Sequence, residues 1–144
     1  MRNVKHIVVH CTAGPQNQST QSILNFWRNE LRWRNVGYHV LIDADGTATV
    51  LATPDRVTNG VAGQNSTSYH IAYKGGQHGI DNRTEAQKKA LRAAIMKAKK
   101  LWPKARIVGH RDLSPDLNQD GIISPNEWTK LCPGFDARKE YQNL

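Results

Sequence analysis

TEAQKKALRAAIMKAKKLWPKARIVGH, residues 84–110, predicts a capped helix followed by a buried strand. Thr84 and Gln87 match the capping box that opens a helix, and the apolar residues after them recur at helical spacing. Pro103 ends the helix, and the Ile–Val run that follows is typical of a buried strand. This strand leads directly into His110. A helix joined to a strand in this way indicates an α/β fold.

The rest of the chain repeats this alternation of strand-like and helix-like segments. Between two strand-like segments, Asp45-Gly46 is a strong signal for a β-hairpin. We therefore expect a single α/β domain over residues 1–144, in which a mixed β-sheet of about five strands is flanked by helices. The expected strands are residues 5–10, 36–43, 47–53, 69–76 and 105–110, and the expected helices are residues 20–34, 84–102 and 136–142.

Composition limits where the protein acts and what it binds. No stretch approaches the roughly 20 apolar residues that a membrane span needs, so we expect no membrane insertion. The apolar run Ile7–Val9 is shorter than the core of a signal peptide, which predicts synthesis in the cytoplasm without one. The net charge of +8 favours anionic partners such as nucleic acid or a bacterial cell wall. No nucleic-acid motif accompanies the charge, so we expect no specific nucleic acid as partner, and nothing demands more than a monomer.

Two histidines lie at the ends of short apolar strands: His10 follows IVV and His110 follows IVG. Strand ends in α/β proteins open onto the usual ligand cleft. With Cys132 downstream, these residues form a His–His–Cys set that suits zinc and leaves the fourth position for water or substrate. That open position distinguishes a catalytic zinc from a structural one. Cys11 alternates to the opposite face of its strand, where we expect it in the core.

The segment between His110 and Cys132 carries a second candidate metal site. Residues 116–127 match the calcium loop, with a glycine at position 6 and an isoleucine carbonyl at position 7. The oxygen ligands would come from Asp116, Asn118, Asp120, Ile122 and Glu127. Pro115 argues against an entering helix, so the match is to the loop and not to a full EF-hand. The alternative is a polar connector of turn-forming residues. If the loop binds calcium, we expect the ion to order this insertion and fix Cys132 relative to His110.

Five motifs together resemble the type 2 N-acetylmuramoyl-L-alanine amidases: VVHCTA, VGYHVLID, DGT, GHRDLSP and KLCPGFD. They stand in the family's order and span about His6 to Phe135. The closest resemblance is to the bacteriophage lysozymes that are amidases, and peptidoglycan recognition proteins share the fold. The resemblance implies a hydrolase that cleaves the amide between N-acetylmuramic acid and L-alanine of the stem peptide. Its partners would be peptidoglycan or muropeptides.

By motif position, the resemblance implies zinc on His10, His110 and Cys132, with Tyr38 and Lys130 beside the metal as catalytic residues. A cation at Lys130 suits a developing oxyanion, and Tyr38 can hydrogen-bond that oxyanion or a water molecule. Without the family, these two residues would be interpreted as a strand aromatic and a surface lysine.

The loop GVAGQNSTSY, residues 60–69, corresponds to the stretch that lines the family's substrate groove. The resemblance implies that Asn65 contacts the glycopeptide. The following strand departs from the family, because SYHIAYKGG stands where the family reads closer to SIGI…GG. His6, His70 and His78 have no partner that the sequence can name.

Three other functions compete with the amidase. A non-catalytic peptidoglycan recognition module shares the fold, but such members generally lack the cysteine ligand that Cys132 supplies. A nucleic-acid-binding protein accounts for the charge but not for the His–His–Cys set. A muramidase needs paired carboxylates, and nothing in the sequence places Asp112 beside Glu127. Without a signal peptide, the route to the wall would be that of a phage endolysin released through a holin pore; a recycling enzyme and a delivered effector are the alternatives.

Overall fold

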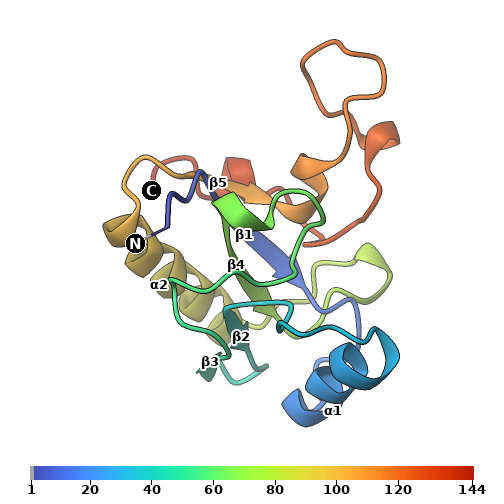
Figure 1. The fold of residues 1–144 in the computed structure, drawn as a ribbon, viewed down its shortest axis with the longest axis vertical. Coiled ribbons are helices and arrows are strands. Elements are labelled where there is room, and N and C mark those ends of the chain that lie inside the picture. The colour runs from blue at the N-terminus through green and yellow to red at the C-terminus, as the bar shows by residue number, and fades with distance from the viewer. Residues whose placement is uncertain (1) are drawn as a thin grey trace.

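Residues 2–144 are described by a computed structural model, and they form the predicted mixed sheet with helices on both faces (Figure 1). The five strands lie in the order β3-β2-β4-β1-β5. Every neighbouring pair is parallel except β2 and β3, which form the hairpin that Asp45-Gly46 predicts. The strands are β1 His6–Cys11, β2 Val40–Ile42, β3 Ala48–Val50, β4 Ser68–Tyr73 and β5 Arg106–Gly109.

One of the helices agrees with the sequence pattern, and the other two are shorter than expected. Helix α2 spans Glu85–Leu101 and opens with the predicted capping box, and α3 is a short turn at Ala137–Glu140. Helix α1 spans Thr20–Asn25 and continues as a π-helix, η1, over Phe26–Glu30. The expectation of one helix over residues 20–34 was therefore wrong at its end. The chain leaves the helix at Arg32, whose φ of 58° is left-handed.

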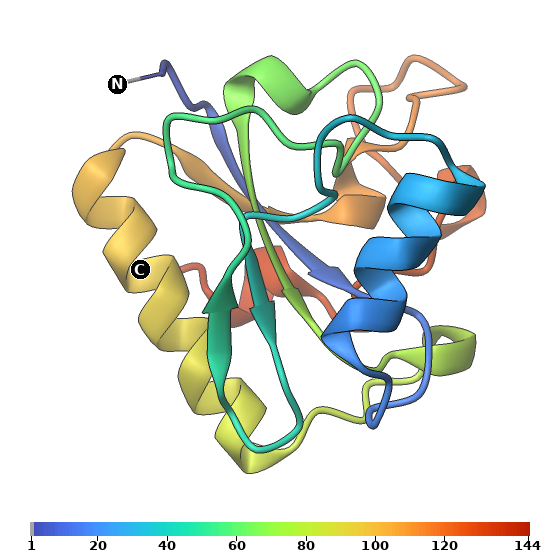
Figure 2. The same cartoon turned by 60° about the horizontal axis from the view of Figure 1, so that its bottom comes forward.

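The helices divide between the two faces of the sheet, with α2 on one side and α1 on the other (Figure 2). The larger core lies between the sheet and α2, and it contains Cys11, as predicted. On the opposite face, Ile23 and Trp27 pack against Leu41 and Ala72. Alternation along β1 therefore sends Cys11 into the larger core and its neighbour His10 to the face that α1 partly covers.

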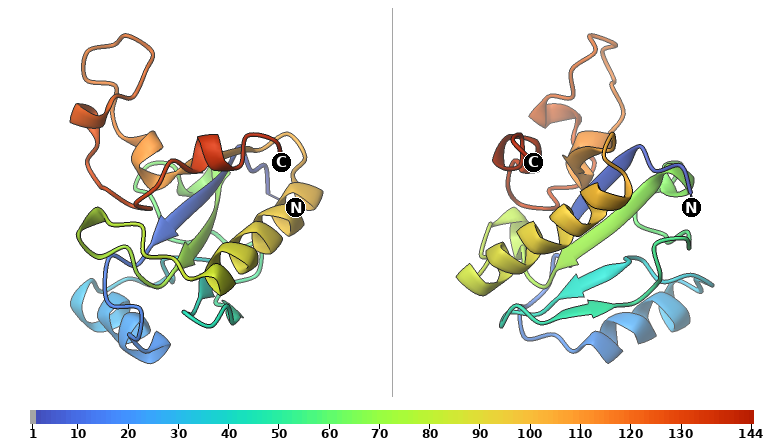
Figure 3. Two further views of the ribbon diagram at one scale, coloured as in Figure 1. Left: turned by 180° about the vertical axis from the view of Figure 1, so that it is seen from behind. Right: turned by 90° about the vertical axis from the view of Figure 1, so that its left-hand side faces the viewer.

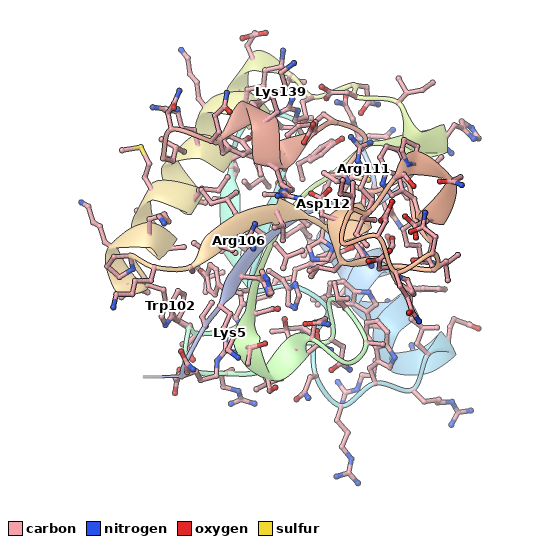
Figure 4. All side chains as sticks on the ribbon, turned by 90° about the horizontal axis from the view of Figure 1, so that it is seen from above. Lys5, Trp102, Arg106, Arg111, Asp112 and Lys139 are labelled. Carbon is pink, nitrogen blue, oxygen red and sulfur yellow. The ribbon has the colours of Figure 1, made fainter. Side chains whose placement is uncertain are left out.

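Parallel pairing brings the ends of β1, β4 and β5 to the same edge of the sheet. Arg106 begins β5, and Arg111 and Asp112 follow its end (Figure 4). After this turn the chain makes the loop of residues 116–127, which stands away from the sheet (Figure 3). It then returns, and the backbone N–H of Arg111 donates to the carbonyl of Cys132 at 3.0 Å.

Candidate active site

The three predicted metal ligands, His10, His110 and Cys132, lie together at this edge. One ligand atom from each lies within 4.8 Å of the other two. His10 is on β1, and His110 begins the 3₁₀ turn that follows β5. The third ligand is held by the backbone N–H of Cys11, which donates to Sγ of Cys132 at 3.0 Å. The fold thus assembles a set that is widely separated in sequence.

The protonation states of this cluster fit a zinc ion, and so does a buried ring nitrogen that has no hydrogen-bond partner among the described residues. Nδ1 of His10 is buried and has no hydrogen-bond partner among the described residues. Burial lowers the pKa of His10 well below its ordinary value, and burial together with Lys130 lowers the pKa of His110 to about 4. Both imidazoles are therefore neutral near pH 7 and have a bare nitrogen. Burial raises the pKa of the Cys132 thiol, which a bound cation would reverse. Two neutral imidazoles and a thiolate are ligands that zinc prefers.

A cavity of about 1000 Å³ opens beside this cluster. One wall is apolar and comes from α1, η1 and the segment after them, including Phe26, Trp27, Leu31 and Trp33. Five of the residues predicted from sequence line the cavity: Tyr38, Asn65, His110, Lys130 and Cys132. A cavity with an apolar wall and a few convergent polar groups is typical of a substrate site.

Tyr38 and Lys130 approach the cluster from different segments. The Tyr38 ring lies 4.9 Å from the His10 ring, centroid to centroid, and its hydroxyl donates to the Cys11 carbonyl at 3.4 Å. Burial and the nearby thiols of Cys132 and Cys11 raise the pKa of Tyr38, so the phenol stays protonated and can donate a hydrogen bond. Lys130 is exposed at the cavity, and its charge contributes to the lowered pKa of His110.

His70 is a site residue that the sequence interpretation missed. Its Nδ1 lies 2.8 Å from Nε2 of His10, and its Nε2 lies 2.9 Å from Oδ1 of Asn65. The same Asn65 oxygen accepts from the backbone N–H of Val61 at 2.8 Å. The only signal in the sequence was the departure of SYHIAYKGG from the family pattern, which does not indicate a contact with His10.

The calcium-like loop forms a second, separate cluster. Oxygens of Asp116, Asp120 and Glu127 lie within 4.8 Å of one another. Asp116 accepts from the backbone N–H of Gly121 at 2.8 Å, and Gly121 has the left-handed φ of +82° expected for the sharp turn. The Glu127 carboxylate accepts from the N–H of Ser124 at 3.0 Å. As expected, no entering helix precedes the loop within the described chain, which has only the 3₁₀ turn of residues 110–113 there.

The carboxylates that a muramidase would use are engaged in local turns instead. Asp112 accepts from the backbone N–H of Gly109 at 2.7 Å, and Glu127 belongs to the calcium-like loop. Among the helices of residues 2–144, none has the length and apolar character that crossing a membrane requires.

Comparison with known proteins finds similar sequences and structures over most of the chain. The endolysin of Klebsiella phage KP32 is 30% identical over 152 residues, which cover 98% of this chain and 87% of the endolysin. The solved Ph2119 endolysin of a Thermus scotoductus bacteriophage is 26% identical with a TM-score of 0.72, covering 93% of this chain and 79% of that one. PGRP-SA of Apis mellifera shares the fold, with a TM-score of 0.76 at 20% identity, covering 100% of this chain and 84% of that one. The family model described as N-acetylmuramoyl-L-alanine amidase matches residues 1–135, and the chain belongs to this amidase family.

Proposed function

We propose that the protein is a zinc-dependent amidase that hydrolyses the bond between N-acetylmuramic acid and L-alanine of the peptidoglycan stem, in the manner of a phage endolysin. The observation that carries this proposal is the convergence of His10, His110 and Cys132 beside a cavity that Tyr38 and Lys130 also line. A His–His–Cys set supplies three ligands and leaves the open position that a catalytic zinc needs.

The roles of the surrounding residues follow from their charge and position. Zinc, when bound, supplies a Lewis acid that polarises the scissile carbonyl and lowers the pKa of a water molecule. Lys130 places a positive charge at the cavity, where it stabilises the oxyanion that develops on the carbonyl oxygen. The protonated hydroxyl of Tyr38 donates a hydrogen bond to the same oxyanion or to the water. The apolar wall excludes bulk water from the scissile bond and orients the substrate.

The competing function is a recognition module that binds peptidoglycan without cleaving it. The fold is compatible with this function, because PGRP-SA shares it. The complete ligand set with Lys130 favours hydrolysis. The net charge of +8 is compatible with both, since it would hold either protein on an anionic wall.

Product analysis of digested peptidoglycan separates the two functions. Purified peptidoglycan is incubated with the protein as isolated, after chelation, and after chelation with zinc added back. The amidase releases new L-alanine amino termini without new reducing sugars, and chelation abolishes and zinc restores this release. If the protein binds the wall and no new amine appears under any condition, it is a recognition module and the catalytic roles of Tyr38 and Lys130 are wrong.

We also propose that residues 116–127 bind Ca²⁺. The spacing of the oxygen ligands supports this, as does the position of Asp116, whose Oδ1 is buried without a hydrogen-bond partner among the described residues. The loop joins His110 to Cys132, so ordering it by calcium would hold two of the zinc ligands in place. Residues outside the loop already close its base, since the N–H of Thr129 donates to Oγ of Ser114 at 3.1 Å.

A calcium titration of thermal unfolding tests this second site. Calcium at about 100 times its Kd should stabilise the parent protein by about 2.7 kcal/mol. Asp120→Ala should lose that gain, whereas Asn126→Ala, which changes a loop position that supplies no ligand, should keep it. If calcium alters neither the melting nor the activity of the parent protein, the loop is only a connector.

A further inference from the structure

We propose that His70 is a positioning residue that selects the tautomer of His10 in which Nδ1 is bare and directed to the metal. This inference rests on the proposed zinc site, because it concerns how one zinc ligand is prepared. The argument comes from a chain of three hydrogen-bonding side chains, His10, His70 and Asn65, which we call the imidazole relay.

The relay begins with the register of two neighbouring strands. In the parallel pairing of β1 and β4, Val8 lies opposite His70 and His10 lies opposite Ala72. Val8 and His10 alternate to the same face of the sheet, so His10 and His70 meet on that face. Both side chains are almost completely buried, at 1% and 0% exposure, and their ring centroids are 4.9 Å apart.

The hydrogen bonds of Asn65 determine which atoms of the relay donate and which accept. The backbone N–H of Val61 can only donate, so the Asn65 atom that lies 2.8 Å from it is the carbonyl oxygen. Nε2 of His70 lies 2.9 Å from this oxygen and must therefore carry the hydrogen. A neutral His70 with hydrogen on Nε2 has a bare Nδ1, which can only accept.

The same reasoning then fixes His10. Because Nδ1 of His70 accepts, Nε2 of His10, at 2.8 Å, must donate. The neutral His10 ring is left with a bare Nδ1, and this is the buried atom without a partner among the described residues. His10 thus offers the metal a lone pair on Nδ1, while its Nε2 donates a hydrogen bond to His70. A partner of this kind orients a ligating histidine and raises its basicity.

The surroundings hold the His70 ring in the geometry that the relay needs. Gly60 lies against the ring so closely that a Cβ there would be 2.3 Å from Nδ1 of His70. The backbone N–H of His70 donates to Nδ1 of His39 at 3.0 Å.

The relay connects the metal cluster to the wall of the cavity. Asn65 lines the cavity beside His110 and Cys132, and its carbonyl oxygen is already used by Val61 and His70. Asn65 was expected to contact the glycopeptide. In our proposal, its carbonyl oxygen serves the relay instead.

The test compares two substitutions of similar size that differ in whether they can accept a hydrogen bond. His70→Leu removes the acceptor, whereas His70→Asn keeps an acceptor oxygen near the position of Nδ1. Leu41→Val is the control for loosened packing, because Leu41 packs with Ala72 on the same face of the sheet and takes no part in the hydrogen bonds of the relay. Zinc affinity is measured by competition with a chromophoric chelator. We expect a loss of about 10- to 100-fold for His70→Leu and a loss within about threefold for the other two variants.

A second readout does not depend on zinc. Long-range ¹H–¹⁵N correlation spectra of the metal-free protein report which nitrogen of His10 carries hydrogen. The parent protein and His70→Asn should show hydrogen on Nε2, and His70→Leu should show a mixture of tautomers. Hydrogen on Nδ1 of His10 in the parent protein would overturn the relay even if His70→Leu did not fold.

The outcomes separate this inference from the proposed function. Unchanged zinc affinity and an unchanged His10 tautomer in folded His70→Leu would leave the zinc site intact and overturn the role of His70. Failure of the parent protein to bind zinc would instead contradict the proposed function, and the tautomer spectra would still decide the relay.

Discussion

The backbone N–H of Cys11 donates to the sulfur of Cys132 at 3.0 Å, and this contact joins two segments that carry the proposed metal ligands. Cys11 follows His10 on β1, so the bond fixes the third ligand relative to the first. Both cysteines are buried in the larger core and border the cavity, but they differ in their neighbours, because only Cys132 is grouped with His10 and His110. Among the described cysteines, only Cys132 has its sulfur within 4.8 Å of a ligand atom of both His10 and His110.

Substitution of the two cysteines should therefore give opposite results. Cys132→Ser should lower bound zinc and amidase activity by more than about 100-fold. Even a residue that only hydrogen-bonds to a metal ligand contributes about 10- to 100-fold to metal affinity or activity. Cys11→Ala retains the backbone N–H and should keep both, with a stability loss of about 1 kcal/mol for the missing sulfur. Zinc content by atomic absorption and release of L-alanine amino termini are the measurements. Zinc retained at full occupancy in Cys132→Ser would contradict the ligand assignment.

Lys130 should act on the rate and not on metal binding. Lys130→Met should lower kcat by about 100- to 1000-fold, the usual effect of removing one group that stabilises an oxyanion. Zinc content and sedimentation with peptidoglycan should stay near parent values. The matched control is Lys139→Met, which removes the same charge from an exposed position on α3 (Figure 4). If both variants lose activity equally, Lys130 contributes only to the overall charge.

The structure confirms that His10, His110 and Cys132 lie together. The sequence could predict the pairing of the two histidines because both occupy strand ends. His10 and His110 follow buried apolar runs, and parallel strands bring such positions to one edge of the sheet. The resemblance to a family then added Tyr38 and Lys130, which line the same cavity. Neither would have been selected from residue type and spacing alone.

The relay and the end of the first helix were not predictable in the same way. His70 sits within β4, and its contact with His10 depends on the register of β4 against β1, which no local pattern in the sequence gives. The π-helix of Phe26–Glu30 is likewise a tertiary effect, because Trp27 packs against the sheet and the N–H of Trp33 donates to its carbonyl at 2.9 Å. Apolar spacing predicts a helix there but not where it ends.

Gly60 should be a sensitive glycine near the site. A methyl group there would overlap the His70 ring, with contacts of 2.3 to 2.5 Å to three ring atoms, so the ring or the loop must shift. Gly60→Ala should cost about 1 to 3 kcal/mol of the free energy of unfolding, the usual range for overpacking. Urea unfolding measures this cost. In the control Gly14→Ala, the methyl would meet only the end of the flexible Gln18 side chain, and parent-like stability is expected. A Gly60→Ala protein as stable as the parent would show that the loop can move away from His70.

The ion pairs of Arg83 should make the protein sensitive to acid. The Arg83 side chain is 2% exposed, it donates to both oxygens of Glu140 at 2.7 and 2.9 Å, and it also donates to Asp81. Its guanidinium lies 3.4 Å from the centre of the Phe135 ring. These contacts tie α3 and the chain just after Cys132 to the start of α2.

The sign of the pH effect follows from the two carboxylates. Hydrogen bonds from Arg83 lower the pKa of Glu140 and the pKa of Asp81 below their ordinary values of 4.5 and 3.8. A carboxylate with a lower pKa in the folded state stabilises the protein above its unfolded pKa, and this stability is lost as the pH falls through the folded pKa. The contribution of Glu140 should therefore be complete at pH 7 and decline below about pH 4.5.

Glu140→Gln isolates that contribution. The variant should be less stable than the parent by about 1 to 2 kcal/mol at pH 7, and the difference should shrink between pH 4.5 and 3. Buried histidines also destabilise the fold in acid, but they do so in both proteins, so the difference between the two unfolding curves reports Glu140 alone. The exposed Glu30 provides the control substitution, Glu30→Gln, for which we expect no comparable loss at pH 7. A stability difference that stays constant from pH 7 to pH 3 would mean that Glu140 contributes through packing and not through its charge.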